Sequence, residues 1–240
     1  MSKVAWDAIG DKLFSTGVDR GMLYVAAGNW YGKGVGWNGL TTVTEKPSGG
    51  EENKQYADNQ KYLSLLSKED FGATIEAFYS PEEFDQCDGT AEIASGVKIG
   101  QQERKGFAFS YRTKIGNDVK GTDYGYEVHI VYGCKASPTE KTRATENESP
   151  EAPTLSWEIT TTPIAMPGNM KPASHLWVST LGAGVTDEKM QQLEDMLYGT
   201  DAVEADVEHN IEAHEATDPV CPTPAQVVAI FGAINPNNAG

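Results

Sequence analysis

Strict alternation of apolar and polar side chains is the feature that most constrains how this chain folds. It is clearest in residues 107–112, 124–132 and 155–160, where one set of alternate positions is rich in aromatic or large apolar side chains and the other is mixed. A period of two residues places successive side chains on opposite faces of a β-strand. Each segment therefore predicts a strand with one buried face in an antiparallel sheet. In the third segment, Leu155, Trp157 and Ile159 are expected to face the core.

Other segments predict shorter strands and two loops. Four glycines between residues 28 and 36 predict irregular, flexible backbone. Residues 45–59 are polar and contain proline and glycine, so they predict a long exposed inter-strand loop. The further strands expected are residues 22–27, 37–43, 61–66 and 71–79, the last two forming a hairpin closed by a turn at 67–70.

The C-terminal part has a different pattern. Thr186 is a suitable N-cap for a helix over residues 187–198, with Met190, Leu193 and Leu197 on one face. No Lys or Arg follows Met190, whereas nine acidic residues do, and a short apolar helix is expected over residues 225–234. The predicted fold class is therefore mainly β: an antiparallel β-sandwich with a flanking α-helix, a long inter-strand loop and a C-terminal extension. We expect a β-sandwich domain over residues 1–199 and an acidic arm over residues 200–240.

Composition excludes several classes of protein. Nineteen Lys and Arg against 35 Asp and Glu give a net charge of −16, which disfavours a protein that grips nucleic-acid phosphates. The N-terminal residues lack the apolar stretch of a secretory signal, and the longest apolar run, residues 227–234, is far below the roughly 20 residues of a membrane span. No membrane association is expected.

Three widely spaced cysteines without a CxxC motif predict free thiols in a reducing cytoplasm.

The motifs of catalysis and metal binding are weak. Gly34, Gly36 and Gly39 match the spelling of a dinucleotide-binding loop, but β-branched residues follow where a helix should open. His129 is expected to be a satisfied sheet residue. The acidic arm has a loose group of potential ligands without a metal-site spacing: His209, Glu212, His214 and Glu215. The sequence therefore predicts no enzyme, no catalytic residue, no cofactor and no metal site.

An ordered series of short segments resembles a known family. The longest are YADNQKYL at residues 56–63 and FGATIEAFYSPEEFDQCDG at residues 71–89. The others are GQQER at 100–104, FSYR at 109–112, IGND at 115–118, GTDYGY at 121–126, VYG at 131–133, WEITTTP at 157–163 and LYG at 197–199. Together they resemble the major tail proteins of long-tailed bacteriophages that infect Gram-positive bacteria. The resemblance covers most of residues 20–200 and does not extend beyond Thr200.

This resemblance implies a structural protein of the virion. In that family the fold is a β-sandwich with a flanking helix. Six copies form a ring whose inner sheets join into one β-barrel, and stacked rings form the tube that conducts DNA into the host. The implied partners are further copies of the chain, the tape measure, tail tip and tail terminator proteins, and DNA that passes without specific binding. The implied location is the virion tail, assembled in the host cytoplasm. The family commonly stacks rings through a long loop, here matched by Glu45, Lys46, Glu51, Glu52, Lys54 and Tyr56.

The charge of the chain suits such a conduit, because carboxylates on a lumen repel DNA phosphates whereas Lys and Arg would hold them. Period-two alternation places Glu158 opposite the core-facing side chains of its strand, and Glu76 and Glu127 are similar candidates from other strands. We therefore expect Glu76, Glu127 and Glu158 to face the lumen.

Two alternatives remain at this point. The first is a tail terminator or another tail protein that forms a single ring, which would assemble rings but no tubes. The second is a carbohydrate-binding β-sandwich, suggested by Trp30, Tyr31 and Trp37 near the glycine-rich segment, which a glycan titration would reveal.

Overall fold

The computed structural model describes residues 6–143, 145, 148, 152–203 and 213–232. Strands dominate this part of the chain and the helices are few and short, so the mainly β prediction is confirmed. The strands are β1 (Leu13–Ala27), β2 (Trp30–Trp37), β3 (Leu40–Glu45), β4 (Ser48–Gly49), β5 (Glu52–Ala57), β6 (Gln60–Leu66), β7 (Glu69–Asp70), β8 (Gly72–Ala77), β9 (Ala91–Ala94), β10 (Val97–Ile99), β11 (Phe107–Asn117), β12 (Gly121–Ala136), β13 (Leu155–Thr161) and β14 (His175–Ser179). The helices are α1 (Asp85–Asp88), which follows a 3₁₀ turn over Glu82–Phe84, α2 (Asp187–Tyr198) and α3 (Pro224–Phe231).

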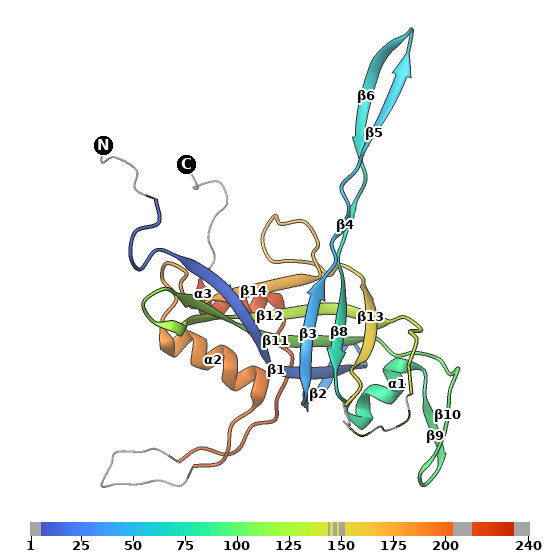
Figure 1. Cartoon of the computed structure of the whole chain (residues 1–240), viewed down its shortest axis with the longest axis vertical. Helices are drawn as coiled ribbons and strands as arrows, with labels where there is room; N and C mark the ends of the chain where they lie inside the picture. The colour runs from blue at the N-terminus through green and yellow to red at the C-terminus, as the bar shows by residue number, and fades with distance from the viewer. Residues whose placement is uncertain (1–5, 144, 146–147, 149–151, 204–212, 233–240) are drawn as a thin grey trace.

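One antiparallel sheet forms the body, in the strand order β2-β1-β11-β12-β13-β8-β3. The long strand β12 pairs with β14 through residues 127–131 and with β13 through residues 134–136. Because β12 changes partner along its length, β13, β8 and β3 are carried across the face of β1 and β11, as Figure 1 shows. The sheet therefore folds over itself as an antiparallel sandwich.

A core rich in aromatic side chains lies between the two halves of the sandwich. Trp157 is fully buried, and its ring centroid lies 5.3 Å from that of Trp37 and 5.6 Å from that of Phe84. Leu155 and Ile159 pack in the same cluster. The alternation predicted for residues 155–160 is thus confirmed, because the intervening Glu158 and Thr160 are exposed.

The opposite face of β1, β11 and β12 is covered by helices α2 and α3 (Figure 1). Tyr24 donates a hydrogen bond of 2.7 Å to the Leu197 carbonyl, and Tyr132 donates one of 3.0 Å to the Pro222 carbonyl. As a result Ala108 and Ser110 are as completely buried as their aromatic neighbours. The prediction of one buried face was therefore wrong for β11, whose two faces contact two separate cores.

The C-terminal helices follow their sequence signals. Thr186 caps α2 by accepting a hydrogen bond from the Lys189 backbone N–H, and the predicted apolar face of Met190, Leu193 and Leu197 is buried. Helix α3 begins at Pro224 after a capping box formed by Thr223 and Gln226. The predicted α2 is confirmed, and so is the described part of the second predicted helix, which packs on the body of the protein.

The glycine-rich segment is strand β2 instead of the flexible loop that was predicted. It pairs with β1, and a side chain at Gly34 would place its Cβ 2.5 Å from the Tyr24 ring. The backbone N–H of Gly34 also donates a hydrogen bond of 2.8 Å to the Pro219 carbonyl. Here glycine permits the close approach of a ring and a second chain segment. The strand predicted over residues 37–43 is divided by a turn at residues 38–39, which separates β2 from β3.

The largest departure from the sequence predictions is the segment between β3 and β8. Residues 45–59 do not form a loop, and residues 61–66 do not pair with residues 71–79. Instead β5 pairs with β6, β4 pairs with β7, and β8 lies between β13 and β3. The result is a long two-stranded hairpin, here called the projecting hairpin (residues 46–71), that extends away from the body (Figure 1).

The turn of the projecting hairpin explains this departure. Ala57 pairs with Gln60, so Asp58 and Asn59 form a two-residue turn, and both have positive φ, 51° and 62°. Two successive positive φ values are typical of the type I′ turn, whose twist matches that of paired strands. Asp and Asn tolerate this conformation better than other residues with side chains. The Asp58-Asn59 pair was the signal that the sequence analysis did not use.

Candidate functional site

The projecting hairpin is exposed on both of its faces. Every residue of β5 and β6 is exposed, and the exposed fractions of Tyr62 and Leu66 both reach 75%. Alternation along β6 places Tyr62 and Leu66 on one face and Leu63 and Leu65 on the other. Both faces therefore present apolar side chains that the described part of the chain does not cover.

The polar contacts of the projecting hairpin are weak. Lys61 and Ser64 both contact the Glu52 carboxylate, and the Lys54 Nζ lies 3.3 Å from it. The Lys61 contact is the main cause of a lowered pKa for Glu52. Ion pairs this exposed contribute little to stability. The long projection thus has neither a core nor strong ion pairs of its own, which is typical of a segment that packs against another molecule.

The six residues predicted for ring stacking fall in three places. Glu52, Lys54 and Tyr56 lie on β5, and Glu51 precedes it, so these four belong to the projecting hairpin. Lys46 lies at its root, with its Nζ 3.3 Å from Glu158 Oε1 on β13. Glu45 turns inward instead, and its carboxylate accepts a hydrogen bond of 2.7 Å from the Tyr111 hydroxyl.

The three predicted lumen carboxylates do not lie on one surface. Glu76 on β8 and Glu158 on β13 both point away from the core of the sandwich, as their alternation with Ile75 and Trp157 requires. Glu127 on β12 points the other way, toward His129, and its Oε2 is 3.9 Å from His129 Nε2. Thus Glu76 and Glu158 share an outer face, here called the outer β8–β13 face, and Glu127 lies at the mouth of a pocket.

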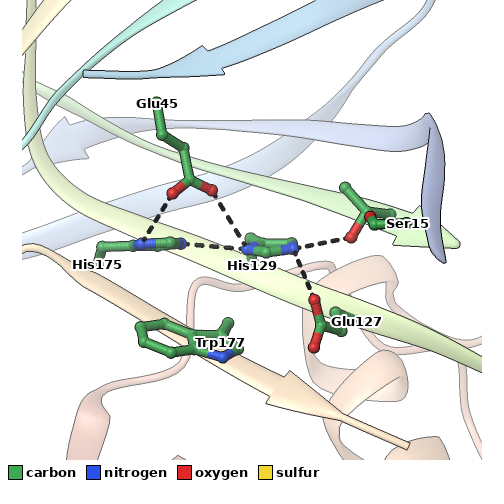
Figure 2. A pocket seen from close by; sticks show the side chains of 7 residues that line it. Ser15, Glu45, Glu127, His129, His175 and Trp177 are labelled. Atoms are coloured by element: carbon green, nitrogen blue, oxygen red, sulfur yellow. Dashed lines mark hydrogen bonds and ion pairs between the residues drawn. The ribbon is translucent and has the colours of Figure 1, made fainter. Parts of the chain in front are cut away.

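That pocket, here called the histidine pocket, opens beside β3, β12 and β14 (Figure 2). It has a volume of about 340 Å³ and is lined by Ser15, Glu45, Thr113, Glu127, His129, His175 and Trp177. His129 Nδ1 lies 3.2 Å from His175 Nε2, which is the distance of a hydrogen bond between the two rings. Glu45 lies above both rings, with one carboxylate oxygen 3.8 Å from His129 Nδ1 and the other 3.8 Å from His175 Nδ1.

Aromatic packing fixes both rings of the histidine pocket. The His129 ring stacks on Tyr111 with 4.6 Å between centroids and 2° between planes, and the His175 ring stacks on Phe71 at 4.6 Å. Burial lowers the pKa of His129, and the nearby His175 lowers it further. Burial also lowers the pKa of His175, against the opposing effect of Glu45. Both imidazoles are therefore neutral at pH 7.

Sequence reasoning treated His129 alone and did not connect it with His175 or Glu45. The three residues are far apart in the sequence, and no motif spacing links them. Their proximity follows from the pairing of β12 with β14, in which Val131 is opposite His175 and His129 is opposite Trp177. Of the acidic group considered for metal binding, His209 and Glu212 lie outside the described residues, whereas His214 and Glu215 are exposed.

The aromatic residues that suggested a carbohydrate site pack against the protein's own chain and do not form an exposed aromatic surface. Trp37 is 2% exposed within the core. Trp30 donates a hydrogen bond of 2.8 Å from its Nε1 to the Cys221 carbonyl, and the Tyr31 hydroxyl accepts one of 2.8 Å from the Gly133 N–H. All three cysteines are buried free thiols.

Within the described residues, none of the helices has the length and apolar character needed to cross a bilayer. No known protein family matches the sequence, and no curated protein is significantly similar to it. The functional interpretation therefore rests on the structure and on the ordered series of segments described above.

Proposed function

We propose that the chain is a structural virion protein: the protomer of stacked, hexameric rings that form a phage tail tube and conduct DNA into the host cell. Under this proposal the protein has no catalytic role. Its partners are copies of itself, the tape measure, tail tip and tail terminator proteins, and passing DNA. Its location is the tail of the virion.

The observation that carries this proposal is the projecting hairpin with two uncovered apolar faces. A two-stranded hairpin is marginally stable on its own in water. Burying Leu63, Leu65 and Leu66 would yield roughly 1.5–3 kcal/mol for each side chain. A groove on a neighbouring copy would provide that burial, and a repeated hairpin-in-groove contact generates stacked rings or tubes.

The edges of the sheet support the same proposal. The terminal strands of the sheet order are β2 and β3. Residues 219–220 cover part of the β2 edge, through the Gly34–Pro219 hydrogen bond and a bridge between Lys33 and Val220. Edge strands tend to pair with other chains unless they are blocked. Pairing of β3 with a strand of the next protomer would join the sheets of a ring.

The outer β8–β13 face has the chemistry expected of a DNA conduit. It presents Glu76 and Glu158, while the neighbouring residues Thr42, Thr44, Thr74 and Thr160 are short and polar. The amino group of Lys46 is paired with Glu158. A neutral-to-acidic surface offers few counterion-releasing contacts to phosphates, so DNA would slide over it.

Electron microscopy of the concentrated full-length protein, with light scattering for mass, tests the proposal. Tubes with a central hole are expected, and single rings that never elongate would favour the tail terminator alternative. Leu65→Ser should abolish stacking. Ile93→Ser on the short β9–β10 hairpin is the matched control, because Ile93 is 62% exposed and Leu65 57%. A 25.9 kDa monomer that persists with tail tip proteins added would refute the proposal.

A further inference from the structure

The histidine pocket contains the donor set of a transition-metal site. Glu45, His129 and His175 each offer one ligand atom, and these atoms all lie within 4.8 Å of one another. They come from three strands, β3, β12 and β14, and converge on one point in Figure 2. Two imidazoles and a carboxylate are donors that suit Zn²⁺ and do not suit Ca²⁺ or Mg²⁺, which prefer oxygen ligands alone.

We propose that Glu45, His129 and His175 bind one Zn²⁺ ion, with water as the fourth ligand. The inference is independent of tube assembly and goes beyond the proposed function. It concerns residues that no sequence motif connects.

The distances between the donors approach those that this ion requires. Tetrahedral Zn²⁺ with ligands at about 2.0–2.1 Å requires its ligand atoms to be roughly 3.3 Å apart. The His129 Nδ1–His175 Nε2 distance is 3.2 Å, and the distance from His129 Nδ1 to Glu45 Oε1 is 3.8 Å. All three ligand atoms lie within 4.8 Å of one another, so binding requires the Glu45 carboxylate to move closer to the two rings. The pocket volume of about 340 Å³ leaves ample room for the ion and its water.

Neighbouring groups orient the donors in the way that metal ligands are usually oriented. The Thr113 hydroxyl lies 2.9 Å from His129 Nε2, which leaves Nδ1 to face the other two ligands. The Tyr111 hydroxyl donates to Glu45 Oε1 and holds the carboxylate over the rings. Such second-layer contacts fix the ring orientation and raise metal affinity.

The electrostatic environment also favours a cation. In the hydrogen bond between the two rings one nitrogen carries a proton, which a bound metal ion would displace. Glu127 adds a second carboxylate 3.9 Å from His129 Nε2. The pocket therefore combines two imidazole donors with two nearby carboxylates.

A bound ion would strengthen the connection between two halves of the fold that already touch through the Tyr111–Glu45 hydrogen bond and the Phe71–His175 stack. Strand β3 leads directly into the projecting hairpin, whereas β12 and β14 belong to the opposite half of the sandwich. A ligand from each side would fix the root of the hairpin to the body and limit its swing.

Zinc binding is tested with the full-length protein after chelator treatment and dialysis against Zn²⁺. We expect one Zn²⁺ per chain by elemental analysis and an increase in melting temperature with added Zn²⁺. Glu45→Gln and His175→Ala should each weaken binding at least tenfold, the minimum seen for loss of a second-layer contact. The matched control is His214→Ala, which removes an exposed histidine and should leave binding unchanged.

Substitution with Co²⁺ provides a readout that needs no variant. The expected spectrum has the intense visible bands of tetrahedral Co²⁺. A wild-type protein that retains no metal, a weak octahedral spectrum, or an equal loss of binding in His214→Ala would overturn the proposal. Circular dichroism confirms that each variant is folded, and Glu45→Gln preserves an acceptor for Tyr111.

Discussion

Two β-hairpins of this protein represent opposite ways to hold a pair of strands together. The β11–β12 pair at the centre is buried on both faces, by the aromatic core on one side and by α2 and α3 on the other. The β5–β6 pair of the projecting hairpin is buried on neither face. Backbone pairing is similar in the two, so the difference lies in side-chain burial. The first pair is covered by its own chain, whereas the second is left uncovered by the described residues.

The strongest test of this comparison removes one large side chain from each region. Trp157→Ala should destabilise the monomer by about 3–5 kcal/mol, because it leaves a cavity among packed rings. Tyr62→Ala on β6 is the matched change, and we expect an effect below about 0.5 kcal/mol because its ring is exposed. Urea unfolding measures both, and comparable losses would contradict the comparison.

The second face of the central pair can be tested separately. Leu193 on α2 is fully buried against β11 and β12, and Leu193→Ala should cost about 2–5 kcal/mol. Gln192→Ala on the exposed face of α2 is the control and should change stability little. If Leu193→Ala destabilised the protein as little as its control, the packing of α2 against β11 and β12 would not contribute to the free energy of unfolding.

The sequence predicted strand β13 of the sandwich better than the projecting hairpin, for a physical reason. Strands with a buried face carry an alternation that is visible in the sequence, as Leu155, Trp157 and Ile159 did. The apolar residues of β6 do not alternate with polar ones, because neither of its faces packs on the chain's own core. The sequence analysis therefore paired β6 with residues 71–79, and only the Asp58-Asn59 turn indicated its correct partner, β5.

The candidate sites divide in the same way. Alternation placed Glu76 and Glu158 on the outer face of the sheet from local pattern alone. Alternation could not show that Glu127, Glu45 and the two histidines lie close together. Their proximity depends on the tertiary pairing of β12, which pairs with β14 along one part of its length and with β13 along another. Local patterns determine which face a side chain occupies, whereas tertiary pairing determines which side chains meet.

A smaller test concerns a polar contact at the edge of the central region. Arg112 on β11 donates two hydrogen bonds of 2.7 Å to the Asp19 carboxylate, and these lower the pKa of Asp19. A lowered pKa contributes stability above the unfolded-state pKa of Asp, about 3.9, and that stability is lost as pH falls through the folded-state value. Asp19→Asn should cost about 1 kcal/mol at pH 7, because the pair is partly exposed. The difference from wild type should shrink as pH falls below about 3.9, and a pH-independent difference would exclude this origin.

The smallest expected effect lies in the turn of the projecting hairpin. Asn59→Gly relieves the positive φ of 62° and should stabilise the hairpin by a few tenths of a kcal/mol. Asn59→Val is the opposite change, because a β-branched residue strongly disfavours this conformation. Hydrogen exchange of the β5 and β6 amides should slow in Asn59→Gly and accelerate in Asn59→Val, while the β11 amides remain unchanged in both. A matching change in β11 would show that the hairpin and the body unfold as one unit, and the contrast between a pair buried on both faces and a pair exposed on both faces would then fail.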